Sequence, residues 1–178
     1  SASVVLADAD LPVAIKGSLF SGLMNNGQTC VSTTRILVPA DLYDEAVEMA
    51  TEYVRQLVVG DPAEMSTDVG PLISRRQQES VAAHVDRALE QGAKATVGAA
   101  IPENTEGFYY LPTILRDVTP EMDIARQEVF GPVLAFIAYD SVDEAITIAN
   151  NTDYGLAAAV WGADLAGATS VCDRLVAG

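Results

Sequence analysis

Short, continuous apolar runs alternate along the chain with segments whose apolar residues recur every three or four positions. The short runs are rich in Val, Ile and Leu and predict buried strands. Apolar residues at helical spacing predict helices with one buried face. The expected strands cover residues 3–6, 34–39, 94–97, 109–115, 133–139 and 156–161, and the expected helices cover 10–24, 41–57, 74–91, 141–150 and 164–176.

Residues that cap helices stand at the expected helix starts, namely Asp10, Asp41, Ser74, Ser141 and Asp164. Gln77 and Glu144 lie three residues after the two serines, which is the spacing of a capping box. Pro12, in the first turn, supports the earliest start. Strands that alternate with helices predict an α/β fold with a mostly parallel, open sheet flanked by helices. We expect a single domain over residues 1–178.

Composition narrows the class of protein. The 178 residues are enough to bury a core, and 49% of them are apolar. The 25 Asp and Glu outnumber the 10 Lys and Arg, giving a net charge of −15 without a basic cluster. This balance argues against a nucleic-acid or anionic-membrane partner. No apolar run reaches the roughly 18 residues that a membrane helix needs.

The chain has two cysteines and one histidine, too few for a disulfide framework or a recognisable metal site. Its first residues show no signal-peptide pattern. We therefore expect a cytoplasmic location. The sequence lacks an initiator Met and begins almost inside a strand-like run, so we expect a piece of a longer protein.

Cys30 stands in a polar, glycine-bearing segment between an expected helix and an expected strand. The helix before it is rich in Ala, Gly and Ser, which lets another backbone approach closely. Junctions of this kind often carry reactive groups in α/β domains. The alternative is a buried and inert thiol, which is the usual state of a free cysteine.

His84 is the only histidine that could activate Cys30 as a base. It lies on an expected helix with an apolar line of Val81, Val85 and Leu89, and we expect a half-exposed surface side chain. A Cys/His dyad therefore has little support. Cys172 has core spacing in the last helix, and we assign it no role.

Two segments far apart in the chain resemble motifs of the aldehyde dehydrogenase superfamily. Residues 26–35 read Asn-Gly-Gln-Thr-Cys-Val-Ser-Thr-Thr-Arg, like the family's cysteine motif. Residues 127–133 read Gln-Glu-Val-Phe-Gly-Pro-Val, like its Glu-Glu-x-Phe-Gly-Pro-Val motif. Further matches follow in family order at 70–72, 111–113 and 150–157. The resemblance runs from end to end and implies the catalytic domain of the aldehyde dehydrogenase fold.

The resemblance implies that Cys30 is the nucleophile of an NAD- or NADP-dependent enzyme that oxidises an aldehyde to a carboxylic acid. The thiolate attacks the aldehyde carbon to give a thiohemiacetal, hydride transfer gives a thioester, and water releases the acid. A thiolate suits this sequence because it is both a strong nucleophile and a good leaving group. The backbone N–H of Cys30 is implied as one oxyanion donor.

Two residues of the second motif are implied to contact the cofactor. Glu128 matches the carboxylate that holds the nicotinamide ribose hydroxyls, a task suited to two acceptor oxygens. Phe130 matches an aromatic residue near the nicotinamide, although core packing before Gly131-Pro132 is an alternative. Without the motif, Glu128 is a solvated residue before a turn. The segment 150–156 is interpreted as structural, a helix stop followed by a strand start.

The sequence also departs from the family pattern. The family's general-base glutamate lies in a Glu-Leu-Gly-Gly-Lys segment that would precede residue 1. Its Rossmann-like NAD(P) domain, an asparagine oxyanion donor and its oligomerisation strands are likewise outside the 178 residues, and Gln127 replaces the first Glu of the motif. We therefore expect a partial catalytic domain that is inactive alone and exposes apolar surface that would otherwise meet the missing domains. Its expected partners are the aldehyde, the missing NAD(P)-binding domain and further copies in a homo-oligomer.

Two other readings remain open. A relative that reduces acyl thioesters or acyl phosphates would use the same cysteine, although the Glu-x-Phe-Gly-Pro motif argues against the acyl-phosphate reductases. A non-catalytic scaffold fragment is the alternative outside enzymes. The aldehyde does not follow from these residues, because substrate pockets in the family draw on several segments, some of which are not in the sequence. The choice between NAD and NADP does not follow either, because it lies in the missing domain.

Overall fold

The computed structural model describes residues 1–103 and 106–178. A six-stranded sheet runs through it in the order β3-β4-β5-β2-β1-β6. The strands are β1 (Ala2–Val5), β2 (Arg35–Pro39), β3 (Lys94–Val97), β4 (Thr113–Arg116), β5 (Val133–Tyr139) and β6 (Ala158–Trp161). Every adjacent pair is parallel except β3 and β4. The predicted mostly parallel α/β sheet is confirmed.

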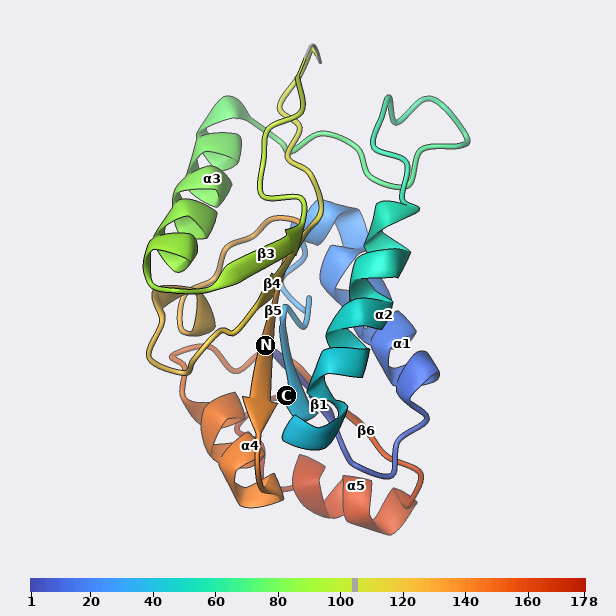
Figure 1. Cartoon of the computed structure of the whole chain (residues 1–178), viewed down its shortest axis with the longest axis vertical. Helices are drawn as coiled ribbons and strands as arrows, with labels where there is room; N and C mark the ends of the chain where they lie inside the picture. Colours follow the sequence, from blue (N-terminus) through green and yellow to red (C-terminus); the bar gives the residue numbers. More distant parts are fainter. Residues whose placement is uncertain (104–105) are drawn as a thin grey trace.

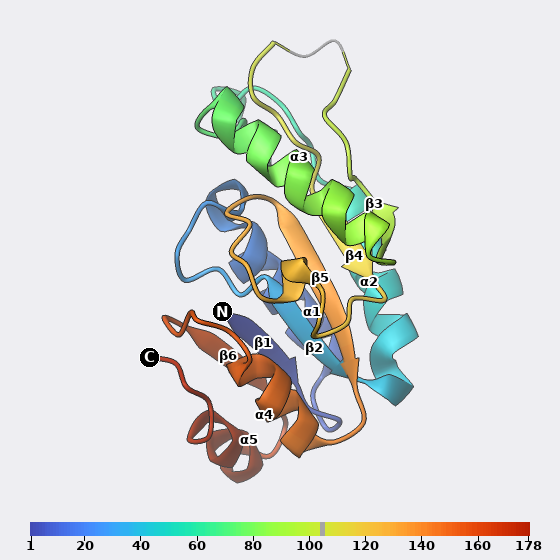
Figure 2. The same cartoon turned by 90° about the vertical axis from the view of Figure 1, so that its left-hand side faces the viewer.

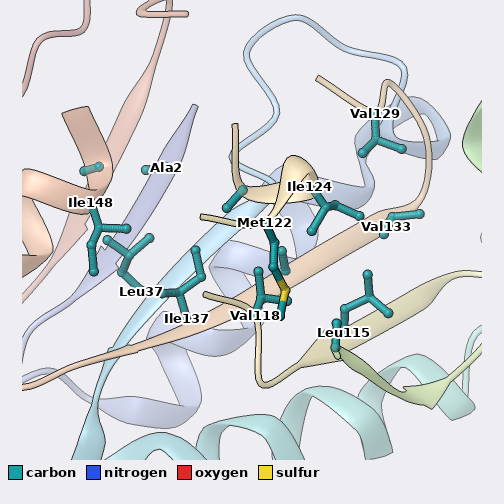
Figure 3. Close-up of a cluster of buried hydrophobic side chains, with 14 of the residues drawn as sticks. Ala2, Leu37, Leu115, Val118, Met122, Ile124, Val129, Val133, Ile137 and Ile148 are labelled. Atoms are coloured by element: carbon teal, nitrogen blue, oxygen red, sulfur yellow. The ribbon is translucent and has the colours of Figure 1, made fainter. Parts of the chain in front are cut away.

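Helices cover both faces of this sheet (Figure 1). They are α1 (Leu11–Leu23), α2 (Tyr43–Arg55), α3 (Arg75–Glu90), α4 (Val142–Asn150) and α5 (Leu165–Cys172), with short 3₁₀ helices η1 (Met24–Gly27), η2 (Ala40–Leu42) and η3 (Asp123–Ala125). One buried cluster joins α1 and α2 to the sheet, and a second joins α3, α4 and α5 to its other face. Part of the second cluster is shown in Figure 3, where Val129 and Val133 lie at one end.

Four of the five expected helix caps are confirmed. The side chains of Asp10, Ser74, Ser141 and Asp164 accept backbone N–H groups at the starts of their helices. The cap expected at Asp41 is wrong. The chain forms η2 there, and α2 follows directly from it without a side-chain cap. A preceding 3₁₀ turn already supplies carbonyl acceptors, so no capping side chain is needed.

Neither expected capping box closes on its own serine. The Gln77 side chain donates to the carbonyls of Val129 and Phe130 instead of binding back to Ser74. The Glu144 carboxylate accepts the N–H of Asp140, one residue before the cap. The serine of each motif therefore caps its helix as expected. The Gln77 side chain makes a tertiary contact instead, and the Glu144 side chain makes a local contact one residue away from the expected one.

The last helix is shorter than expected, and the core assignment of Cys172 is wrong. Helix α5 ends at Cys172, so its buried side is limited to Ala168 and Val171. Cys172 itself is exposed. The expected apolar line required the helix to continue through Leu175, which lies beyond its end and is half-buried.

The small residues of α1 do allow close approach, but side chains fill the space. A Cβ at Gly17 would overlap the Trp161 ring, and a Cβ at Gly22 would overlap Leu134. The buried Ser18 hydroxyl pairs with that of Ser3, 2.7 Å away. Helix α1 therefore packs tightly on strands β1, β5 and β6. None of the helices in residues 1–103 and 106–178 is long and apolar enough to cross a membrane.

Candidate active site

A cavity of about 390 Å³ lies where strands β1, β2, β5 and β6 begin. It is lined by residues from the segments 27–35, 125–130 and 152–156. Figure 2 shows these segments meeting beside the N terminus. Cys30, Glu128 and Phe130, which sequence analysis put forward, all line it. Ligands of open parallel sheets usually bind at the carboxyl ends of the strands, so this cavity at the amino ends is a departure from that rule.

Cys30 lies in a turn, residues 29–32, that follows shortly after η1. The Ser32 N–H donates to the Thr29 carbonyl oxygen at 3.0 Å, which closes the turn around Cys30. The Thr29 hydroxyl donates in turn to the Met24 carbonyl at 3.2 Å. Cys30 is exposed and not in a disulfide. Its thiol is therefore accessible to a molecule in the cavity, and the alternative of a buried thiol is wrong.

The segment before Cys30 is fixed by its own side chains. Asn26 has a left-handed backbone, with φ of 58°. Its side chain accepts the Gly70 N–H at 2.9 Å and donates to the Pro71 carbonyl at 3.1 Å. The side-chain carbonyl oxygen of Gln28 accepts a hydrogen bond from the Ile73 N–H at 3.0 Å. Three hydrogen bonds thus join the cysteine segment, residues 25–34, to the loop before α3.

Phe130 has an unusual backbone for its residue type. Its φ is 54°, in the left-handed region that aromatic residues rarely adopt. The Gln77 amide donates to the carbonyl oxygens of Val129 and Phe130, at 3.1 and 2.9 Å. These carbonyls flank the strained residue. One side chain of α3 therefore stabilises the turn that places Phe130 and the exposed Glu128 at the cavity.

The two segments are in direct contact. Gly27 has φ of 72°, and a Cβ there would overlap the Gly131 carbonyl. Gly131 in turn lies against Val81 of α3, with no room for a Cβ. The cysteine segment and the Phe130 segment, residues 126–132, therefore approach each other at Gly27 and Gly131. This close contact fixes the width of the cavity between them.

Arg35 is a buried cation in the wall of the cavity, 5% exposed. Its guanidinium donates to the carbonyls of Ile148 and Ala149, at 3.0 and 2.8 Å, and to that of Ala125 at 3.4 Å. Two of these carbonyls belong to the last turn of α4, where the helix dipole is negative. Burial lowers the pKa of the Arg35 guanidinium, but an arginine stays charged. Arg35 thus joins α4 and η3 to the start of β2.

Comparison with known proteins identifies the family of this arrangement. The family profile described as "Aldehyde dehydrogenase family" matches residues 1–178. The chain belongs to the aldehyde dehydrogenase family. It is 39% identical over 177 residues to the betaine aldehyde dehydrogenase of Rhizobium etli and 40% identical over 181 residues to the benzaldehyde dehydrogenase YfmT of Bacillus subtilis. These alignments cover 98% and 100% of this chain and 36% of each relative, so the chain spans about a third of their length.

Solved structures of aldehyde dehydrogenases share the fold. The chain superposes on the Mycobacterium tuberculosis aldehyde dehydrogenase in complex with NAD⁺ with a TM-score of 0.97 and 43% identity, over 100% of this chain and 37% of the other. Aldehyde dehydrogenase C of Pseudomonas syringae, in complex with NAD⁺ and octanal, gives a TM-score of 0.97 and 39% identity, over the same shares. The predicted aldehyde dehydrogenase fold is therefore confirmed.

Sequence reasoning missed three parts of the site in this aldehyde dehydrogenase chain. The Gln77 contact was hidden because its spacing from Ser74 fits a local motif. Arg35 is the last residue of the cysteine motif, but nothing in its sequence position reveals that it binds the end of α4. The segment 150–156 does stop α4, as expected, yet its residues 152–156 also line the cavity. Tyr154 and Gly155, which lie in the segment 150–157 that resembles the family, were the available signal.

The described structure does not support a role in the site for His84 or for a bound metal ion. His84 is half-buried on α3, as expected, and does not line the cavity. Burial is the main cause that lowers its pKa, with Arg87 adding to the effect and Asp123 opposing it. Within residues 1–103 and 106–178, no group of three or more His, Cys, Asp and Glu side chains could hold a metal ion.

Proposed function

We propose that this chain is the cysteine-bearing part of the catalytic domain of a longer NAD- or NADP-dependent aldehyde dehydrogenase. The observation that supports this proposal is that one cavity is lined both by Cys30 and by Glu128 and Phe130, which are far from it in sequence. The relatives of known name are aldehyde dehydrogenases, and several solved relatives are NAD⁺ complexes. The chain spans about a third of their length, so the remaining machinery belongs to segments outside these 178 residues.

Cys30 is the proposed nucleophile. Its thiolate forms a C–S bond to the aldehyde carbon, and the carbonyl π electrons move to the oxygen. Loss of a hydride from that carbon gives a thioester. Water then attacks the thioester carbon, the C–S bond breaks, and the carboxylic acid and the free thiol result. Cys30 is exposed in the turn of residues 29–32 and lines the cavity, so its thiol is accessible there.

The cavity fits one end of a dinucleotide. Its volume is that of a small-molecule site, and it offers an exposed carboxylate at Glu128 and a half-buried ring at Phe130. Glu128 would accept hydrogen bonds from the ribose hydroxyls, and Phe130 would limit the position of the nicotinamide ring. When bound, the oxidised nicotinamide supplies the hydride acceptor. The described residues of the chain supply the nucleophile, the ribose contact and the walls that fix them.

The proposal covers the wider protein as well. We assign residues 1–178 to a partial catalytic domain whose NAD(P)-binding part lies elsewhere in the same protein. A cytoplasmic homo-oligomer is the proposed setting. The aldehyde stays open, because the similar relatives differ in it: one is named for betaine aldehyde and another for benzaldehyde.

The test is aldehyde oxidation by the full-length protein that contains this chain. Purified protein is supplied with NAD⁺ or NADP⁺ and with acetaldehyde, benzaldehyde or betaine aldehyde, and the reduced cofactor is followed by absorbance. Cys30→Ala should lower kcat by at least about a thousandfold, since the nucleophile is lost. Cys172→Ala is the matched control and should keep wild-type kcat. Wild-type protein that turns over none of these aldehydes, or a fully active Cys30→Ala variant, would contradict the proposal.

A further inference from the structure

One buried hydroxyl at the cavity has no hydrogen-bond partner among the residues that the structure describes. Ser32 is 6% exposed and lies two residues after Cys30, at the closing end of the same turn. Its residue lines the cavity. Among the described residues, the Oγ of Ser32 is the only buried side-chain oxygen or nitrogen atom that has no hydrogen-bond partner. Such groups are rare in native proteins and often mark a functional site.

The neighbouring buried hydroxyls show that this chain ordinarily pairs them. Ser18 and Ser3 share a hydrogen bond of 2.7 Å. Thr33, next to Ser32 in sequence, donates to the Ser21 hydroxyl at 3.1 Å. A buried hydroxyl without a partner costs free energy relative to a methyl group of similar size. The position next to the cavity therefore calls for a partner that arrives from the cavity.

We propose that Ser32 is a ligand-contacting residue whose hydroxyl donates a hydrogen bond to an oxygen atom of the molecule held in this cavity. A change of χ1 turns a serine Oγ about its Cα–Cβ bond without moving the backbone. The turn that contains Cys30 also contains Ser32, so one backbone element positions both residues at the cavity. This inference rests on the proposed function, because the molecule concerned is the cofactor or the substrate attached to Cys30.

The shared chemistry is an acceptor oxygen, and it has two sources. One is a ribose or carboxamide oxygen of the nicotinamide end of the cofactor. The other is the carbonyl oxygen of the acyl group on Cys30. A hydrogen bond to the first stabilises the complex with the cofactor alone. A hydrogen bond to the second acts only after the aldehyde has reacted with the thiol.

The experiment compares Ser32→Ala with Ser18→Ala in the full-length protein. Both variants remove one buried hydroxyl, but only that of Ser18 has a partner in the described structure. Three quantities are measured: Tm without ligand, the Kd for NAD⁺ or NADP⁺ alone, and kcat and KM for an aldehyde that the wild type oxidises. Activity of the wild type itself tests the proposed function separately.

Ser32→Ala should keep or raise Tm, and it should weaken either cofactor binding or kcat/KM for the aldehyde by about 2- to 10-fold. A weaker cofactor Kd identifies the cofactor oxygen. An unchanged Kd with a lower kcat/KM identifies the acyl oxygen. Ser18→Ala should lower Tm and keep both ligand constants. If the wild type is active and Ser32→Ala changes neither constant, the inference is overturned, whether or not Tm falls.

Discussion

The two segments that meet at the cavity solve the same backbone problem by different means. The cysteine segment, residues 25–34, contains two left-handed residues besides Gly27, namely Asn25 and Asn26. The Phe130 segment, residues 126–132, contains one, Phe130 itself. Asparagine enters this region readily, because its short polar side chain can hydrogen-bond locally. Phenylalanine has no such advantage and needs support from outside its own segment.

The source of the hydrogen bonds follows this difference. In the cysteine segment the side chains of Asn26 and Gln28 reach out and hold the backbone of residues 70–73. In the Phe130 segment the backbone is held by Gln77, which belongs to α3. The nucleophile is therefore positioned by its own motif, whereas the proposed cofactor contacts are positioned by a helix distant in sequence. Damage to α3 should affect cofactor binding before it affects the thiol.

The largest effect should come from closing the contact between the two segments. Gly27→Ala places a Cβ against the Gly131 carbonyl and forces a non-glycine residue to φ near 72°. Strain and overlap together should lower the free energy of unfolding by about 2–4 kcal/mol. The shift of both segments should also raise KM for cofactor and aldehyde together. Chemical denaturation and steady-state kinetics measure the two effects.

Gly98→Ala is the matched control for this change. Gly98 also has a positive φ, and its Cβ would overlap the Pro112 carbonyl, but it does not line the cavity. It should lose a similar amount of stability and keep wild-type KM values. Equal kinetic damage from both variants would mean that the contact between Gly27 and Gly131 has no special part in the site.

A smaller and more selective effect is expected at Gln77. Gln77→Met keeps the length of the side chain but removes both hydrogen bonds to the carbonyls that flank Phe130. The loss should cost about 1–3 kcal/mol of stability, since two partly buried acceptors lose their donor. KM for the cofactor should rise by about 3- to 10-fold, with the labelling rate of Cys30 by iodoacetamide unchanged.

The neighbouring Gln78 gives the comparison for that variant. Its amide donates to the Tyr109 carbonyl at 2.7 Å, away from the Phe130 segment. Gln78→Met should therefore lower stability on the same scale and leave the cofactor KM unchanged. If Gln77→Met slows Cys30 labelling as strongly as it weakens cofactor binding, the two segments are not positioned independently.

The reverse selectivity is expected at Asn26. Asn26→Gly keeps the left-handed backbone accessible and removes the hydrogen bonds to Gly70 and Pro71, for a loss of about 1–2 kcal/mol. The rate of Cys30 labelling should change more than the cofactor KM. Asn25→Gly, which removes only a bond to the nearby Gln28 carbonyl, should have a weaker effect. A larger change in cofactor KM than in labelling would contradict this assignment.

Local patterns were sufficient to predict most of the fold. Strands β3 and β5 and helix α4 begin and end where the apolar runs and caps indicate, because each is decided by neighbours in sequence. The errors at Asp41 and Cys172 arise where a helix begins or ends at another residue than expected, and a further one arises where a tertiary contact competes with a local motif. Gln77 is the clearest case: its spacing indicates a capping box, and its amide serves Val129 and Phe130 instead.

The candidate site divides in the same way. Cys30, Glu128 and Phe130 could be proposed from their motifs, and all three line the cavity. Arg35 and Ser32 could not be assigned any contact, because their surroundings come from η3, α4 and the turn geometry. Sequence motifs thus indicate which residues gather at the cavity. Only the packing of distant elements shows what holds them there.

The smallest expected effect uses pH to act on α3 alone. Burial lowers the pKa of His84 below its ordinary 6.5, so the folded state binds a proton less readily than the unfolded chain. Its contribution to stability is therefore complete above pH 6.5 and is lost as the pH falls through 6.5 towards the folded pKa. His84→Gln removes the titration, so the fall in Tm between about pH 7.5 and 5.5 should be smaller than in the wild type. Because His84 shares α3 with Gln77, hydrogen-exchange protection of the wild type, relative to the intrinsic exchange rate at each pH, should fall at residues 129–131 before it falls at residues 26–28 as the pH is lowered. Equal exchange in both segments would show that α3 supports the cysteine segment as much as the Phe130 segment.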